Sequence, residues 1–313
     1  MRGLLAFFLQ LCTALRTPHP CLSNGIGRRA ALTLPLAPTA AVAATDATTV
    51  SYGPREADLY LQPGRRPVVA LLHDSLTASR GSLDAVARDV IARTAYHCVN
   101  FDYRGSGDVE TAMEWLASPE AAALGLTNDV VLIGHGVGGQ LAFRHALRGS
   151  PKLRGTSTTS ARLRGVVACG APLDLREARA LGIDVSGDSP IALLPPAMTS
   201  SLRTAAWTAW EELLVVETSF SLVHGLDDAV VPPALSTRFV VAAATGGIPT
   251  EYHEIKGEGH SSMLDPASYS WRVARAAAVA AMKTQPRPPE TLRMAPTRRA
   301  DTDREILIRT LRM

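Results

Sequence analysis

The chain has 313 residues, of which 46% are hydrophobic and 19% charged, and 32 basic against 29 acidic residues give a formal net charge of +3. This composition excludes an intrinsically disordered chain, and the weak, scattered charge argues against a nucleic-acid partner. No apolar run reaches the roughly 20 residues that a membrane-spanning helix needs, so we expect no transmembrane helix in the mature chain. The four cysteines show neither a disulfide pattern nor metal-ligand spacing, and no metal is expected.

Residues 1–44 are typical of a targeting segment that is removed from the mature protein. Arg2 precedes the apolar run 4–15, as in a secretory signal peptide, and a short buried helix is the alternative. Arg28 and Arg29 then precede a second apolar stretch with small residues at its end, which resembles a twin-arginine export signal. Two stacked signals resemble the targeting of thylakoid-lumen proteins in algae with complex plastids; an exported or secreted protein is the alternative.

Residues 50–283 alternate between predicted strands and helices, after an edge strand or hairpin within residues 52–62. The alternation predicts an α/β fold, in which helices cover both faces of a mostly parallel sheet. Short apolar runs predict strands at 67–73, 96–103, 129–134, 164–170, 219–224 and 250–256. Helical spacing of apolar residues predicts helices at 82–93, 107–116 (with Ser106 as N-cap), 138–147, 233–244 and 262–282.

Two segments depart from this alternation. Residues 171–212 contain four prolines together with Trp207 and Trp210, and they are predicted to form a small cap-like excursion over the carboxyl edge of the sheet. Residues 284–313 are predicted to form a proline-rich linker and a basic tail. A capping box at Thr302 and Glu305 favours a short terminal helix there, and a frayed tail is the alternative.

The strand at 129–134 ends in the glycine-rich turn 134–139, GHGVGG, which has two interpretations. The first is a dinucleotide fingerprint, which requires the first strand of a unit and a carboxylate at the end of the next strand. Here the turn follows the third strand of the alternating series, and the nearest later carboxylate is Asp174. The second is a nucleophile elbow, G-x-S-x-G, in which Gly136 stands at the position of the serine.

Two later residues complete the chain order of an α/β-hydrolase triad. Asp228 follows the strand at 219–224 and is favoured over its neighbour Asp227 as the acid, while His260 follows the last strand. A carboxylate just past a strand end can reach a histidine held on the next loop and orient it. Elbow, aspartate and histidine therefore occur in the order that this chemistry uses.

Residues 57–282 resemble the esterase branch of the α/β-hydrolase superfamily, near its feruloyl-esterase-like and isoprenylcysteine-methylesterase-like members. The resemblance implies the α/β-hydrolase fold, with Asp228 as triad acid and His260 as base. It also implies that the nucleophile is missing at Gly136 and that the oxyanion loop at His73 and Asp74 lacks its glycines. The matching stretches are residues 58–61, 69–73, 102–104, 108–116, 131–142, 224–232 and 257–265.

Three hypotheses for the function follow. The favoured one is a carboxylic-ester-hydrolase-like protein that is catalytically impaired, or that binds a small ester or an anionic ligand near Val137, His73 and Asp74, with no cofactor. The second is an active ester hydrolase in which His260, oriented by Asp228, activates water. The third is a nicotinamide-dinucleotide binder that uses the turn 134–139.

Three other polar residues near the predicted site are interpreted as structural and not as catalytic. His135 is interpreted as a packing residue, His73 as a support of its loop and Ser75 as a polar loop residue rather than a replacement nucleophile.

Overall fold

The structure is a computed structural model that describes residues 46–74, 78–148, 160–183, 185, 190, 218–245 and 248–284. The predicted targeting segment 1–44 and all but the first residue of the predicted tail 284–313 lie outside the described residues. So do Ser75, Trp207 and Trp210, and with them most of the predicted cap-like excursion.

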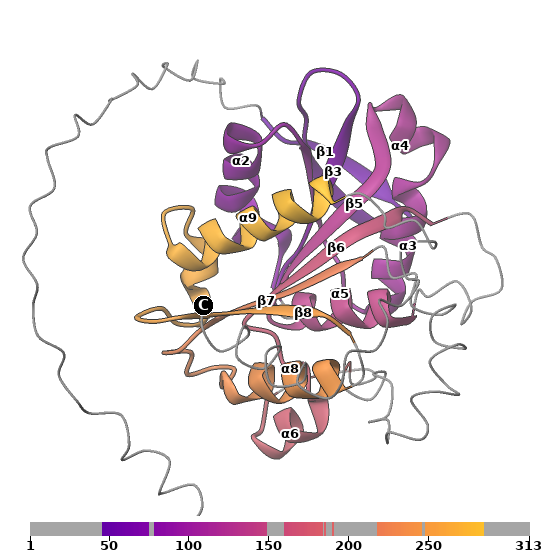
Figure 1. Ribbon diagram of the computed structural model, residues 1–313. Coiled ribbons are helices and arrows are strands. Elements are labelled where there is room, and N and C mark those ends of the chain that lie inside the picture. The colour runs from indigo at the N-terminus through magenta and orange to yellow at the C-terminus, as the bar shows by residue number, and fades with distance from the viewer. Residues whose placement is uncertain are drawn as a thin grey trace, which may run out of the picture. The chain divides into compact units, whose positions relative to one another are not determined.

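The described residues form an eight-stranded sheet in the order β1-β2-β4-β3-β5-β6-β7-β8 (Figure 1). β1 and β2 form an antiparallel hairpin, β2 pairs antiparallel with β4, and every later pair is parallel. The predicted mostly parallel sheet is therefore confirmed, and the hairpin provides its antiparallel edge. The strands are β1 (Thr48–Tyr52), β2 (Arg55–Tyr60), β3 (Arg66–Leu72), β4 (His97–Phe101), β5 (Leu126–His135), β6 (Arg162–Cys169), β7 (Ser219–Gly225) and β8 (Thr250–Ile255).

Helices cover both faces of the sheet, and each face has its own hydrophobic cluster. One cluster packs under α2 (Asp84–Arg93) and α9 (Tyr269–Lys283). The other packs under α3 (Ser106–Leu116), α4 (Pro119–Ala123), α5 (Val137–Arg148) and α8 (Ala234–Thr245). The remaining described helical elements are η1 (Arg80–Leu83), α6 (Leu175–Ala180) and η3 (His260–Leu264).

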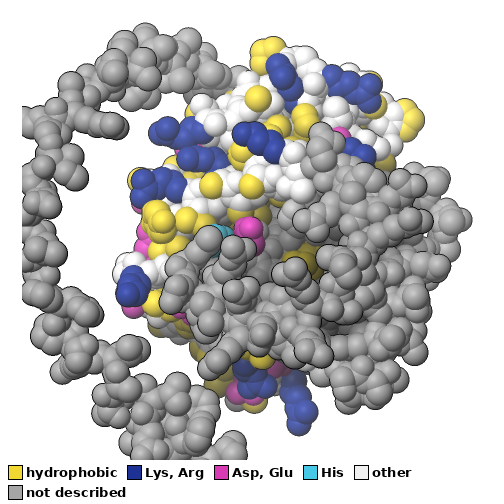
Figure 2. Space-filling model, in the orientation of Figure 1, with side chains coloured by type: hydrophobic (Ala, Val, Ile, Leu, Met, Phe, Trp, Pro, Cys, Tyr) yellow, Lys and Arg dark blue, Asp and Glu magenta, His cyan; other side chains and the backbone are white. Residues whose placement is uncertain are grey.

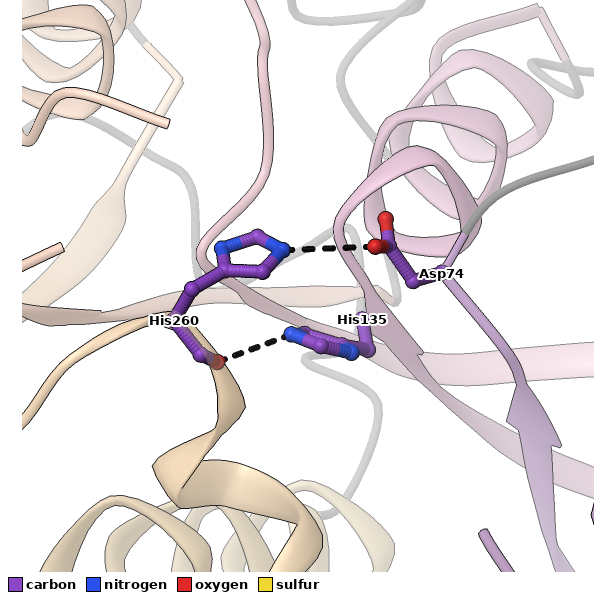
Figure 3. A group of neighbouring side chains, drawn as sticks. All are labelled: Asp74, His135 and His260. Atoms are coloured by element: carbon purple, nitrogen blue, oxygen red, sulfur yellow. Dashed lines mark hydrogen bonds and ion pairs between the residues drawn. The ribbon is translucent and has the colours of Figure 1, made fainter. Parts of the chain in front are cut away.

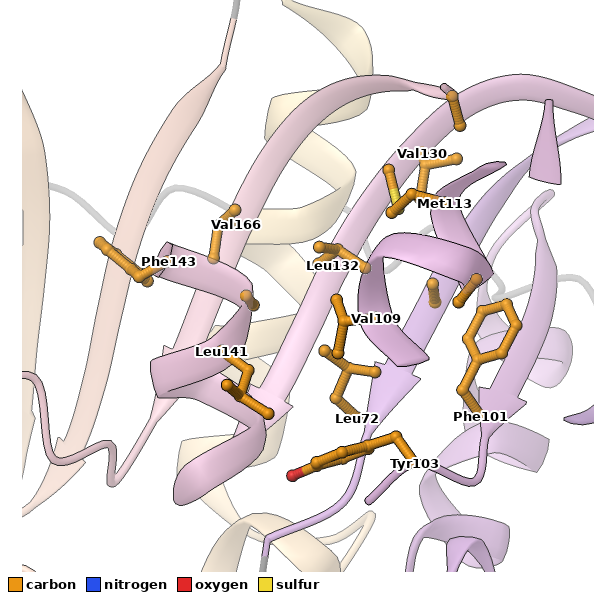
Figure 4. Close-up of a cluster of buried hydrophobic side chains, with 14 of the residues drawn as sticks. Leu72, Phe101, Tyr103, Val109, Met113, Val130, Leu132, Leu141, Phe143 and Val166 are labelled. Carbon is orange, nitrogen blue, oxygen red and sulfur yellow. The ribbon is translucent and has the colours of Figure 1, made fainter. Parts of the chain in front are cut away.

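The apolar run of β3 shows why the sheet is buried on both sides. Val68, Ala70 and Leu72 contact the cluster of α3 and α5, which Figure 4 shows in close-up, because alternate side chains of a strand point to the same face. The intervening Val69 and Leu71 contact the cluster of α2 and α9. A strand with apolar side chains on both faces can bury all of them only between two layers of helices.

Two helix predictions need correction. The helix predicted at 262–282 is two elements, η3 and α9, because the chain turns at Asp265, whose carboxylate accepts from the Ala267 N–H, before Ser268 caps α9. Ser106 is the first residue of α3 and not its N-cap; Gly105 takes that position. The segment predicted as a cap begins with α6, which Asp174 caps by accepting from the Glu177 N–H.

The absence of membrane-spanning helices and the distribution of charge were both predicted from the sequence and can be compared with the described residues. No described helix is both long and apolar enough to cross a bilayer. On the face drawn in Figure 2, the described Lys and Arg side chains are dispersed among apolar and uncharged atoms. Charge on this face is therefore spread and does not form a single basic patch.

The contact between α5 and the end of β3 generates a stability prediction. A Cβ on Gly138 would overlap the carbonyl oxygens of His73 and Leu72 and would lie 2.8 Å from the Leu72 carbonyl carbon. Because these are backbone atoms, we predict that Gly138→Ala lowers the free energy of unfolding by about 3 kcal/mol, measured by urea denaturation. Gly107→Ala is the matched control, since a Cβ on Gly107 meets nothing within 4 Å, and it should be neutral or stabilising by up to about 1 kcal/mol. Equal effects of the two substitutions would contradict this packing.

Candidate active site

A sharp strand-to-helix turn joins β5 to α5, as the elbow interpretation requires. Gly136 is the turn residue, with φ of +51°, a left-handed conformation that residues with a Cβ adopt at a cost. The Gly136 N–H donates to the Cys169 carbonyl (2.9 Å), and the Gly136 carbonyl accepts from the Gln140 N–H (3.1 Å). The turn is thereby tied to β6 on one side and to the first turn of α5 on the other.

Asp228 and His260 are brought together, although 32 residues separate them. The His260 Nδ1–H donates to Asp228 Oδ2 at 2.8 Å. Asp228 lies just past the end of β7, where its other oxygen accepts from the Val230 and Val231 N–H groups at 2.9 and 2.7 Å. The neighbouring Asp227 is exposed, so the structure places Asp228 and not Asp227 against the histidine.

His224 is a second histidine that contacts the Asp228 carboxylate. His224, which is buried on β7, has its Nε2 at 3.2 Å from Asp228 Oδ2 and donates to the Val231 carbonyl at 2.8 Å. The other His224 ring nitrogen is hydrogen-bonded to the hydroxyl of Ser236 on α8 (2.7 Å). The orientation of Asp228 therefore depends on a network that reaches into the core.

The Asp74 carboxylate fills the space beside Gly136. A Cβ built on Gly136 would overlap Asp74 Oδ1 and would lie 2.5 Å from Asp74 Cγ. Asp74 Oδ1 accepts from the Val137 N–H at 3.1 Å, and Oδ2 lies 3.3 Å from His260 Nε2 (Figure 3). The carboxylate thus contacts both the first amide of α5 and the ring nitrogen that points away from Asp228.

Tyr103 holds the loop that carries Asp74. Its hydroxyl lies 2.7 Å from the His73 carbonyl oxygen and 2.9 Å from that of Asp74, to which it donates. Its ring stacks on the fully buried His73 ring at a centroid distance of 4.3 Å. His73 therefore supports the loop from within the core.

His135 lies beneath His260 and is almost fully buried. Its Nε2–H donates to the backbone carbonyl of His260 at 2.9 Å, and the two rings are 4.5 Å apart (Figure 3). His135 packs, as predicted, but it also fixes the backbone from which the His260 ring projects. The side chains of Asp74, His135 and His260 consequently form one cluster, which comes from the loop after β3, the end of β5 and the start of η3.

Hydrogen bonds and charge set the protonation of the cluster. Burial alone would lower the pKa of His260, but the hydrogen bonds and charges of Asp228 and Asp74 outweigh burial and raise it to about 9. Burial would likewise raise the pKa of each carboxyl, yet the bonds from His260, with His224 for Asp228, hold both below their usual range. Burial, reinforced by the charge of His260, lowers the pKa of His135 to about 4.

The described residues include no carboxylate at the end of β6, where the dinucleotide interpretation requires one. β6 ends at Cys169, and Asp174, the nearest acidic residue, instead caps α6 and pairs with Arg238 (3.1 Å). The first amide of α5, at Val137, is already hydrogen-bonded to Asp74. Among the described residues, the ribose-binding carboxylate of a dinucleotide site is therefore absent from the end of β6, and the amide that would face the pyrophosphate is occupied.

Sequence reasoning placed Asp74 in the oxyanion loop but missed that its side chain enters the site. It also missed Tyr103 and His224 as residues that position the cluster. One signal for Asp74 was present, since a carboxylate directly after β3 lies at the carboxyl edge of the sheet, beside the turn after β5. Tyr103 acts through the backbone carbonyls of His73 and Asp74, and His224 acts through the Asp228 carboxylate that it shares with His260. Contacts of these kinds leave no pattern in the sequence.

Comparison with known proteins assigns the fold to a family. The model of the alpha/beta hydrolase family matches residues 69–272, most of the chain, and the protein belongs to this family. No protein with a curated function matches the sequence significantly.

Solved structures of esterases and related hydrolases share the fold at low sequence identity. Esterase 2 of Thermogutta terrifontis is 17% identical, with a TM-score of 0.56 over 81% of this chain and 98% of that one. An alpha/beta hydrolase from a Medee basin deep-sea metagenome library is 16% identical, with a TM-score of 0.53 over 76% and 98%. A carbohydrate esterase from gut microbiota is 17% identical, with a TM-score of 0.52 over 76% and 97%. At such identity the likeness concerns the fold.

The carboxylates around His260 generate a pH prediction. By NMR of labelled imidazoles, we predict that His260 titrates near pH 9 and that His135 stays neutral down to about pH 4. Below the ordinary pKa of about 6.5 the folded and unfolded states both bind the His260 proton, so its contribution to stability is complete there. As pH rises from 6.5 through 9 that contribution is lost.

The same linkage is measurable as a difference in unfolding free energy. The advantage of the wild type over His260→Gln should be larger at pH 6 than at pH 9.5, by on the order of 2 kcal/mol in urea denaturation. A His260 pKa near 6.5, with no pH dependence of that difference, would contradict the cluster as described.

Proposed function

We propose that this chain is an esterase-type member of its family that has lost serine-type ester hydrolysis. The observation that carries the proposal is the Asp74 carboxylate, which occupies the space that a side chain at position 136 would need. A nucleophile is absent at Gly136, and the residue that replaces its volume is anchored to Val137 and His260. Asp74 thus already binds the Val137 N–H and the His260 Nε2, the two groups that would otherwise contact a reacting ester.

The acid and base that remain support an origin in the esterase branch. Asp228 and His260 keep the short hydrogen bond of a triad, 2.8 Å, and the strand-to-helix turn is retained. We therefore propose that the protein derives from the branch near the feruloyl-esterase-like and isoprenylcysteine-methylesterase-like members. A small ester or an anionic ligand that enters the site would compete with the Asp74 carboxylate for the Val137 N–H.

Activation of water by His260 is less well supported. A general base must be unprotonated at working pH, and the two carboxylates raise the pKa of His260 to about 9. Its Nε2 is also directed at Asp74, 3.3 Å away, so a water molecule would have to displace that contact. Impaired hydrolysis is accordingly the function that the geometry favours.

The structure suggests a rescue by two substitutions. We predict that the wild type cleaves p-nitrophenyl acetate at near-background rate and that Gly136→Ser alone gains little, because the new side chain collides with Asp74. Gly136→Ser combined with Asp74→Gly removes the collision and places a hydroxyl beside His260. We expect this double variant to exceed Gly136→Ser by at least about tenfold in initial rate, since a serine nucleophile can contribute far more than that.

Controls separate restored chemistry from simple opening of the site. Asp74→Gly alone should stay at the background rate, and His260→Ala added to the double variant should abolish the gain. A wild type that already hydrolyses the ester well, and that loses this activity in His260→Ala, would show that the chain is an active hydrolase and would refute the proposal.

We further propose that residues 1–44 direct the protein to the thylakoid lumen of an algal plastid, with export from the cell as the alternative. The twin arginines Arg28 and Arg29 and the two apolar stretches of the sequence support this. A fusion of residues 1–50 to a fluorescent protein should enter a plastid or an exported compartment, as followed by microscopy. Replacing both arginines by lysine should block only the last translocation step, and diffuse cytosolic fluorescence of the unmodified fusion would overturn the proposal.

A further inference from the structure

We propose that Asp74, His135 and His260 form a binding site for a divalent transition-metal ion of the zinc class. One ligand atom from each of these three residues lies within 4.8 Å of the other two. Figure 3 shows the three side chains converging from the ends of β3 and β5 and from the start of η3. The inference goes beyond the proposed function, because it concerns what the cluster binds and not whether an ester is cleaved.

The spacing between Asp74 and His260 suits a shared ion better than a direct ion pair. Charge-assisted N–H···O bonds are usually about 2.7–2.9 Å long, as is the 2.8 Å bond from His260 to Asp228. The Asp74 Oδ2 to His260 Nε2 distance is 3.3 Å. Two ligands that are each about 2.0–2.1 Å from a tetrahedral zinc ion lie about 3.3 Å apart, so Asp74 and His260 already have the spacing of two zinc ligands.

The third ligand requires a small closure. Ligand pairs at the outer limit of 4.8 Å must approach by about 1.5 Å to share one tetrahedral ion. His135 is held by the His260 backbone and has little freedom, whereas the Asp74 side chain is about one-third exposed. We therefore expect rotation of the Asp74 side chain to bring its carboxylate into the coordination sphere.

The surroundings of the cluster resemble those that orient metal ligands. Metal-binding histidines usually donate the other ring N–H to a carboxylate or to a backbone carbonyl. His260 donates Nδ1–H to Asp228 and directs Nε2 at Asp74. At neutral pH this Nε2 carries a proton, which the ion would replace and which is released to solvent. His135 donates to the carbonyl of His260, so both rings already have a fixed orientation.

Charge also favours a dication. Asp74 and Asp228 are two carboxylates on either side of His260, and within the described part of the chain their ion pairs are to histidines, with no lysine or arginine to neutralise them. Two imidazoles and one carboxylate suit Zn²⁺ and its neighbours, whereas Mg²⁺ and Ca²⁺ prefer oxygen ligands throughout. Three protein ligands also leave a coordination position for water or a small ligand.

The test is a calorimetric titration of the full chain with Zn²⁺, with Mg²⁺ as a comparison ion. We expect one Zn²⁺ per chain at this cluster, with micromolar or tighter Kd, and no Mg²⁺ binding at similar concentrations. His135→Gln, His260→Gln and Asp74→Asn should each weaken Zn²⁺ binding at least tenfold. Asp228→Asn should weaken it by about 10- to 100-fold, because Asp228 orients His260 without touching the ion.

His253→Gln is the matched control, since His253 lies at the surface on β8 beside Glu251 and outside the cluster. Its Zn²⁺ affinity should equal that of the wild type. Circular dichroism of each variant shows whether it folds; if His260→Gln does not, His135→Gln and Asp74→Asn still decide the question. The visible spectrum of the Co²⁺-loaded wild type should show a low-symmetry nitrogen and oxygen site that is lost in His135→Gln.

Two results would overturn the proposal. One is an absence of Zn²⁺ binding to the folded wild type; the other is binding that survives His135→Gln and Asp74→Asn or depends on His253. Neither result bears on the ester assays, which contain no added metal. The metal site and the impaired hydrolase can therefore fail independently of each other.

Discussion

The position of one carboxylate determines how the whole site is organised. Asp74 lies where the side chain of an elbow residue would project, and it joins the first amide of α5 to the histidine that Asp228 orients. Its place depends on Tyr103, whose hydroxyl binds the backbone carbonyls of His73 and of Asp74 itself. It depends equally on Gly136, because any Cβ there would occupy the same volume.

The fold could be predicted from the sequence because the patterns that indicate its strands and helices are local and repeated. Apolar runs such as β3 are buried on both faces, and that requirement alone predicts a parallel sheet between helical layers. The prediction of helix boundaries was wrong where a single residue turns the chain. At Asp265, for example, one predicted helix is divided into η3 and α9. Helical periodicity continues across such a turn, so the pattern does not reveal it.

The site was only partly accessible, for a different reason. Asp228 and His260 each follow a strand, the chain order of the family predicts both as site residues, and the structure brings their side chains together. The role of Asp74 depends on a contact across 63 residues with Val137, and that of His224 on a carboxylate that it shares with His260. Contacts of this kind arise from the packing of loops at one edge of the sheet, which residue spacing does not encode.

The absence of a side chain at Gly136 and the presence of a carboxylate at Asp74 are physically coupled. With glycine at both positions, the Val137 N–H and the His260 Nε2 would each lose the Asp74 carboxylate as a partner, and buried polar groups without partners are costly. With side chains at both positions, the two would collide. The observed pair satisfies both polar groups and the left-handed turn at once. Glycine at position 136 and the carboxylate of Asp74 therefore fit each other, and His260 is held between the carboxylates of Asp228 and Asp74.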